Sequence, residues 1–130
     1  MPTITSDDLE TLPTVNLVVL RGVASAPPEV RTLKSGLRLA TLGVRVHALA
    51  EGATSVPVSI REPAGWVEDL DEGDPLVVLG VVRRRFFRNA SGATGSRVEV
   101  DATLVGRGTD RRRLDSARRK AEVELDGLGE

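Results

Sequence analysis

A chain of 130 residues, with 40% hydrophobic residues and a formal net charge of −1, is long enough to bury one hydrophobic core. It has no cysteine, which excludes disulfide bonds and thiolate metal sites. Its first residues are acidic where a signal peptide needs bases, and no apolar run approaches the roughly 18 residues of a membrane span. We therefore expect a cytoplasmic protein that has no membrane partner.

The charges are unevenly distributed, and arginine outnumbers lysine sixteen to two. Residues 1–15 carry three acids and no base, residues 107–120 carry seven bases and two acids, and residues 121–130 carry four acids. The planar guanidinium fork suits phosphate recognition, but a bias in the base composition of the genome explains the same ratio equally well.

The first half of the chain predicts three strands. Residues 15–24 are apolar on both faces, so both faces need cover. Prolines and a Ser-Gly turn interrupt residues 25–36. Residues 37–49 alternate, with Ala40, Leu42, Val44 and Val46 on one side, and residues 54–60 form a weaker strand that Pro57 demotes toward an edge.

The second half predicts one helix and two more strands. Residues 62–74 combine Pro63 at a helix start with Trp66 on the face that packs against the core. Residues 75–87 form a long strand, 88–96 a glycine-rich hairpin loop, and 97–106 a strand with Val98, Val100, Ala102 and Leu104 inward. Five strands with a helix between the third and fourth predict an all-β OB-fold, a small Greek-key barrel.

A C-terminal amphipathic helix is predicted for residues 109–128. Its apolar stripe consists of Leu114, Ala117, Ala121, Leu125 and Leu128. Because bases come first and acids last, the charges oppose the helix dipole, so we expect this helix to be stabilised by docking on the barrel or on a neighbouring subunit.

Two sequence blocks in this layout resemble the bacterial single-stranded DNA-binding protein family. The first is "NLVVLRGVASAPPEVRTLKSG", beginning at Asn16, and the second is "EGDPLVVLGVVRRRFFRNASG", beginning at Glu72. The resemblance covers roughly residues 15–106 and implies binding of single-stranded DNA in replication, recombination or repair, by a homotetramer. Independently, residues 15–23 and 76–82 are apolar on both faces, which predicts a homodimer or a homotetramer. Together with the predicted C-terminal helix, this gives an N-terminal extension (1–14), a single-strand-binding OB-fold domain (15–108) and a C-terminal helix and tail (109–130).

The departures from the family concern stacking and recruitment. Family members stack bases on several aromatic residues, whereas here only Phe87 stands at such a position, and the second and third strands carry no ring. The family's acidic, phenylalanine-tipped tail, which recruits partner proteins, is not expected because the chain ends "ELDGLGE".

Residues two apart in a strand share a face, so Arg83, Arg85 and Phe87 are expected on one side, and Arg84 and Phe86 on the other. The first set is a candidate strip for phosphates and one base; alternatively, a ring caps the barrel and the arginines are solvated. The full predicted nucleic-acid site comprises Arg21, Arg31, Arg38, Arg45, Arg83, Arg85, Phe87 and Arg88.

Catalysis and metal binding are not indicated. His47 is the only histidine, and the acids of residues 68–74 surround a predicted helix end, as solvated side chains do. No phosphate-binding glycine loop occurs. We therefore expect no enzyme, metal or cofactor. Two functions stay open: binding of single-stranded DNA mainly through its phosphates, or an OB-fold protein-interaction module. Stacking contributes about 1–3 kcal/mol per base, so the missing rings weaken DNA binding, but neutralisation of phosphates by several arginines can still support it.

Overall fold

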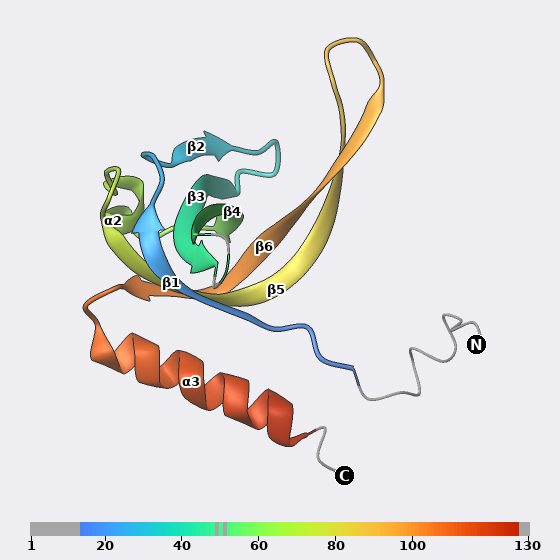
Figure 1. Cartoon of the computed structure of the whole chain (residues 1–130). Helices are drawn as coiled ribbons and strands as arrows, with labels where there is room; N and C mark the ends of the chain where they lie inside the picture. The colour runs from blue at the N-terminus through green and yellow to red at the C-terminus, as the bar shows by residue number, and fades with distance from the viewer. Residues whose placement is uncertain (1–13, 49, 51, 128–130) are drawn as a thin grey trace, which may run out of the picture.

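The computed structural model describes residues 14–48, 50 and 52–127 (Figure 1). The N-terminal extension, except Thr14, and Leu128 with the last two residues of the chain lie outside this part. The elements are β1 (Val18–Ala24), β2 (Glu29–Thr32), β3 (Arg38–Ala48), β4 (Gly52–Arg61), α2 (Gly65–Glu68), β5 (Pro75–Arg88), β6 (Thr94–Arg107) and α3 (Arg111–Asp126).

The strands form one sheet in the order β1-β5-β6-β4-β3-β2, and β1 also pairs with β3. This second pairing, of Val23 with Arg45 and Ala24 with Val44, closes five strands into a barrel. The predicted OB-fold is therefore confirmed, with α2 between β4 and β5 and with α3 after the last strand. No sequence pattern indicated β2, a four-residue strand that pairs with β3 outside the closed ring.

Every second side chain along the strands points into the barrel, and these inward side chains form the hydrophobic core. Ala40, Val44 and Val58 are buried in the core, as are Val78 and Val100 of the last two strands. Val67 and Leu70 of the α2 segment join the same core, and Trp66 packs against it while staying half-buried. The predicted packing role of Trp66 is thus confirmed.

Two residues of β6 do not point into the core as predicted. Val98 is 47% exposed because it lies where the β5–β6 pair has left the barrel. Leu104 is displaced by a register shift, since Leu79 pairs with Leu104 whereas Gly80 pairs with Ala102. The extra residue reverses the alternation, and Val105 packs on the core instead.

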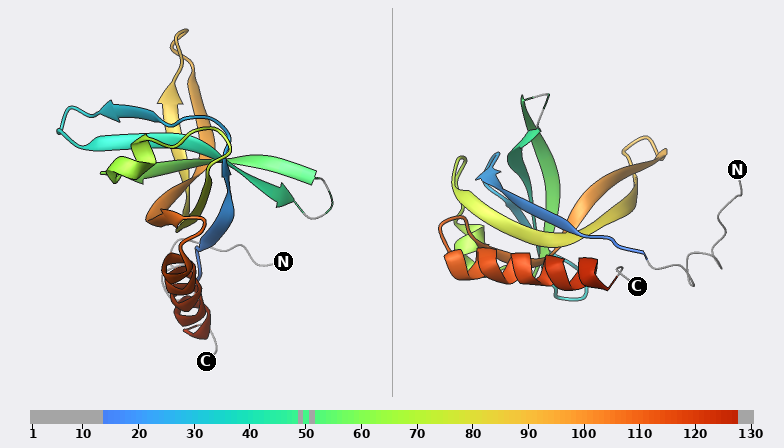
Figure 2. Two further views of the ribbon diagram at one scale, coloured as in Figure 1. Left: turned by 90° about the vertical axis from the view of Figure 1, so that its left-hand side faces the viewer. Right: turned by 60° about the horizontal axis from the view of Figure 1, so that its bottom comes forward.

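Helix α3 contacts β5 and β6 and runs along the outside of the barrel (Figure 2). The Asp110 side chain caps it by accepting a hydrogen bond from the backbone N–H of Arg113 at 3.2 Å. Ala117 is fully buried, whereas Leu125 is 55% exposed and does not dock on the barrel of its own chain. Within the described residues, no helix combines the length and apolar character needed to cross a membrane.

Candidate nucleic-acid interface

The β5–β6 hairpin extends well beyond the barrel as an arm, which we define as residues 82–98 (Figure 1). Its tip is a tight turn in which the Asn89 side-chain oxygen accepts hydrogen bonds from the backbone N–H groups of Ser91 and Ala93. Gly92 adopts a φ of 84°, which glycine tolerates best. The arm carries five arginines and no acid. It is therefore a strongly cationic projection of the barrel.

A groove lies beside the base of the arm, on the outer face of β3 and β4. It is the surface on which OB-folds usually bind oligonucleotides. The segment leading into β2 forms one wall and β6 the other. The lining residues are Ala26, Pro27, Glu29, Thr41, Leu42, Gly43, Ser55, Pro57, Val58, Arg97 and Glu99.

Glu99 is the centre of an ionic cluster beneath this groove. It is only 2% exposed, and it forms ion pairs with Arg85 and, at 3.5 Å, with Arg97. The hydroxyl of Ser59 donates a hydrogen bond to the same carboxylate at 3.1 Å. Nearby, Arg83 pairs with Asp101 at 3.2 Å. Two of the guanidiniums predicted to bind phosphate thus already neutralise carboxylates of the protein.

The two phenylalanines project from opposite faces of the arm, as the alternation predicts. Phe87 lies directly across from Gly95, and a Cβ atom on Gly95 would come within 2.8 Å of the Phe87 ring. Phe87 is 47% exposed and Phe86 is 69% exposed. Neither ring caps the barrel, so that part of the alternative is wrong.

The other predicted site residues divide into two groups. Arg45 is exposed on β3 opposite Ser55, which lines the groove, and Arg31 is exposed on β2. Arg88 is exposed where the arm turns. Arg21, however, lies beside the start of α3 and donates a hydrogen bond to the carbonyl of Gly108. Arg38 pairs with Glu68 of α2. Arg21 and Arg38 therefore already have partners within the protein, at the start of α3 and on α2.

Sequence reasoning missed Arg97, Glu99 and Ser59 as members of the site. The alternation of "RVEVD" placed Arg97 and Glu99 outward, which was a usable signal once their cross-strand partners were known. Ser59 reaches Glu99 because β4 and β6 run parallel for two residues, Val58 beside Val100 and Ser59 beside Asp101. Such a contact has no local signature.

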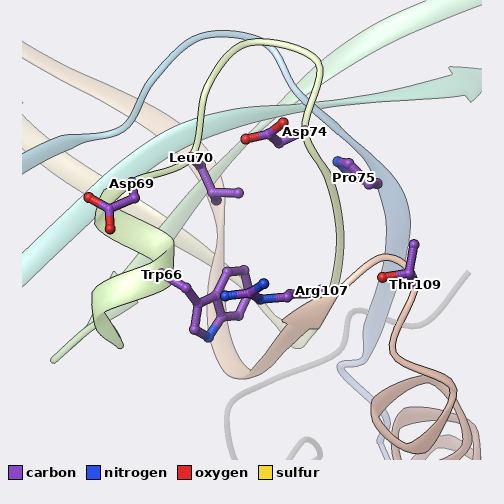
Figure 3. A pocket seen from close by; sticks show the side chains of 7 residues that line it. All are labelled: Trp66, Asp69, Leu70, Asp74, Pro75, Arg107 and Thr109. Atoms are coloured by element: carbon purple, nitrogen blue, oxygen red, sulfur yellow. The ribbon is translucent and has the colours of Figure 1, made fainter.

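A second pocket lies at the α2 end of the barrel (Figure 3). The Arg107 guanidinium stacks over Trp66, 5.4 Å from the ring centroid, and Asp69 and Asp74 also line the pocket. None of the predicted site residues lines it. Among the residues that the structure describes, no three His, Cys, Asp or Glu side chains cluster as metal ligands would. This pocket is not the candidate site.

Comparison with known proteins gives one consistent result, although no family model matches the chain. A single-stranded DNA-binding protein of Thermus thermophilus is 29% identical over 119 residues, which is 88% of this chain and 45% of that protein. A second protein of that name, also from Thermus thermophilus, is 31% identical over 100 residues, 73% of this chain and 38% of the relative.

Among solved structures, a deletion mutant of the single-stranded DNA-binding protein from Thermus aquaticus superposes with a TM-score of 0.59 at 26% identity. The match covers 72% of this chain and 40% of that one. The chain thus spans less than half the length of these relatives. With the barrel, the arm and the two sequence blocks, these similarities show that the chain belongs to the bacterial single-stranded DNA-binding protein family.

Proposed function

We propose that the barrel binds single-stranded DNA along the groove and the adjoining face of the arm. The observation that supports this most directly is the charge of the arm, five arginines and no acid, beside a groove of OB-fold type. A polyanion gains binding free energy there by releasing its counterions. We infer a binding protein rather than an enzyme, acting where single strands are exposed in replication, recombination or repair.

The residues of the proposed interface contribute unequally. Arg31, Arg45 and Arg88 form no ion pair with any residue that the structure describes, so each can neutralise one phosphate. Arg83 and Arg85 must share their charge with Asp101 and Glu99, and they contribute less. Phe87 offers one stacking surface. We therefore expect binding that depends mostly on phosphate contacts.

The test is a fluorescence anisotropy titration of labelled oligothymidylate and of a duplex of equal length at several salt concentrations. For three to five phosphate contacts, log affinity should fall with log salt at a slope between about −2 and −3.5 for the single strand. Single-strand preference is expected because stacking on Phe87 needs an unpaired base. A flat salt response, or tighter duplex binding, would contradict the proposal.

A protein-interaction module is the second candidate, and one observation favours it. Among the residues that the structure describes, no aromatic side chain lines the groove. If the protein binds no single strand even at low salt, a protein ligand of this groove becomes the better explanation.

A further inference from the structure

The face of the arm opposite to Phe87 carries an exposed apolar strip that the proposed groove does not use. Val82 is 43% exposed, Phe86 69% and, from β6, Val98 47%. Arg84 pairs directly with Val98, and Phe86 with Ser96, so these side chains lie together. The side that carries Phe87 is the first face of the arm. The second face consists of Val82, Arg84, Phe86, Arg88, Thr94, Ser96 and Val98.

The arginines of the second face are available to bind an anion, whereas Arg83 and Arg85 of the first face are paired with carboxylates. Arg84 donates a hydrogen bond to the hydroxyl of Ser96 at 3.1 Å, and Arg88 lies opposite Thr94. Neither forms an ion pair with a residue that the structure describes. The second face has hydroxyls and aliphatic groups, and no acid.

Alternation places the ring between two guanidiniums. Arg84 and Arg88 flank Phe86 at a distance of about 7 Å along the strand on either side. An exposed ring between uncompensated cations suits an occupant with a flat π-surface and negative charges on both sides of it. A nucleotide within a single strand has this chemistry. An apolar protein surface would leave both guanidiniums without a partner.

We propose that Phe86 is a second base-stacking position and that Arg84 and Arg88 hold the neighbouring phosphates, so that a bound single strand crosses the edge of the arm and contacts both faces. This inference rests on the proposed function and deepens it. It also assigns most of the stacking to the more exposed ring, Phe86, rather than to Phe87, which packs on Gly95.

The test compares Phe86→Ala, Phe86→Leu and Phe87→Ala variants of the 130-residue chain with the wild type in the same anisotropy titration. Loss of one stacked base should weaken binding by about 5- to 150-fold. Phe86→Ala and Phe86→Leu should both show this loss, because leucine keeps apolar area but has no ring. Phe86 is exposed, so these variants should fold with an unchanged melting temperature, which circular dichroism checks.

The matched charge experiment uses two double variants. Arg84→Ala with Arg88→Ala should flatten the salt slope by about 1.4, two phosphates at roughly 0.7 each, whereas the proposed function without the second face predicts only about 0.7, from Arg88. Arg111→Ala with Arg112→Ala removes the same charge from exposed positions on α3 and should leave the slope unchanged.

Three outcomes would overturn the inference. If the wild type binds, the Phe86 variants bind as tightly as the wild type, and the Arg84/Arg88 variant flattens the slope by only about 0.7, the second face is not used and the proposed function stands. If Phe86→Ala changes only the mass in light scattering and not the affinity, the strip contacts a second copy of the chain. If the wild type binds no single strand, the proposed function fails together with this inference.

Discussion

At the scale of single residues, the buried carboxylate of Glu99 determines what its arginine neighbours do. A carboxylate that is 2% exposed needs compensating charge and hydrogen bonds, and Arg85, Arg97 and Ser59 supply them. Arg85 therefore links the first face of the arm to the barrel wall. We therefore expect Arg85 to contribute more to the position of the arm than to phosphate binding.

We predict that Arg85→Ala lowers the free energy of unfolding by about 1–3 kcal/mol, because it leaves the buried carboxylate partly uncompensated. Arg88→Ala, at an exposed position of the same arm, should change it by less than about 0.5 kcal/mol. Urea denaturation measures both. The double variant Arg85→Ala with Glu99→Gln should recover part of the loss, since no charge is then buried alone. Equal effects of the two arginine variants would show that the Arg85–Glu99 ion pair does not stabilise the fold.

At the scale of elements, the docking of α3 depends on a close approach at Gly106. A Cβ atom on Gly106 would collide with the Arg113 side chain in the first turn of α3 and would lie 3.2 Å from a methyl group of Val77. The small residues continue along the helix as Ala117, which is fully buried, and Ala121, which is half-buried. The helix therefore packs closely over its first turns.

Gly106→Ala should displace the first turn of α3 and lower the free energy of unfolding by about 1–3 kcal/mol, as overpacking does. Gly65→Ala is the matched control, since nothing lies within 4 Å of a Cβ atom there. The control should be neutral or slightly stabilising. Thermal unfolding followed by circular dichroism checks both. If the two variants have the same melting temperature, α3 tolerates a wider separation from β6 than its packing indicates.

Local alternation accounts for the parts of the fold that could be predicted from the sequence. It identified the inward residues of β3 and the two faces of the arm, because a regular strand repeats every two residues. It missed β2, since four residues with only Val30 facing the core show no period. It also failed at Leu104, because the register shift after Leu79 is a property of the strand pair.

For the candidate nucleic-acid site, too, the sequence predicted the direction of the side chains but not their partners. The alternation indicated the orientation of Arg83, Arg85 and Phe87, but it could not show that Asp101 and Glu99 take up the two guanidiniums. Those pairings depend on the register between β5 and β6. Helical periodicity likewise could not show whether Leu125 docks on the barrel or on a neighbouring subunit, because it does not show where the supporting sheet ends.

At the scale of the whole molecule, α3 covers only part of the barrel's outer surface. Leu79 of β5 is 3% exposed on that side, whereas Val19, directly opposite it on β1, is 45% exposed. Val123 and Leu125 near the end of α3 are also exposed, and Val123 borders a hollow that reaches Leu17 and Leu79. Apolar side chains of two elements thus surround an incompletely filled surface, where a second subunit would bury them.

We predict that the protein is a homo-oligomer, a dimer or a tetramer, and that Val19 contributes to its interface. Multi-angle light scattering at micromolar concentration should give a mass that is two or four times 13.9 kDa. Val19→Lys should lower that mass or raise the concentration needed for assembly, because it would bury an unpaired ammonium group in the interface. Val98→Lys, on the arm and away from α3, is the matched control and should leave the mass unchanged. A mass of 13.9 kDa for the wild type would show that α3 alone covers enough of this surface for a monomer to persist.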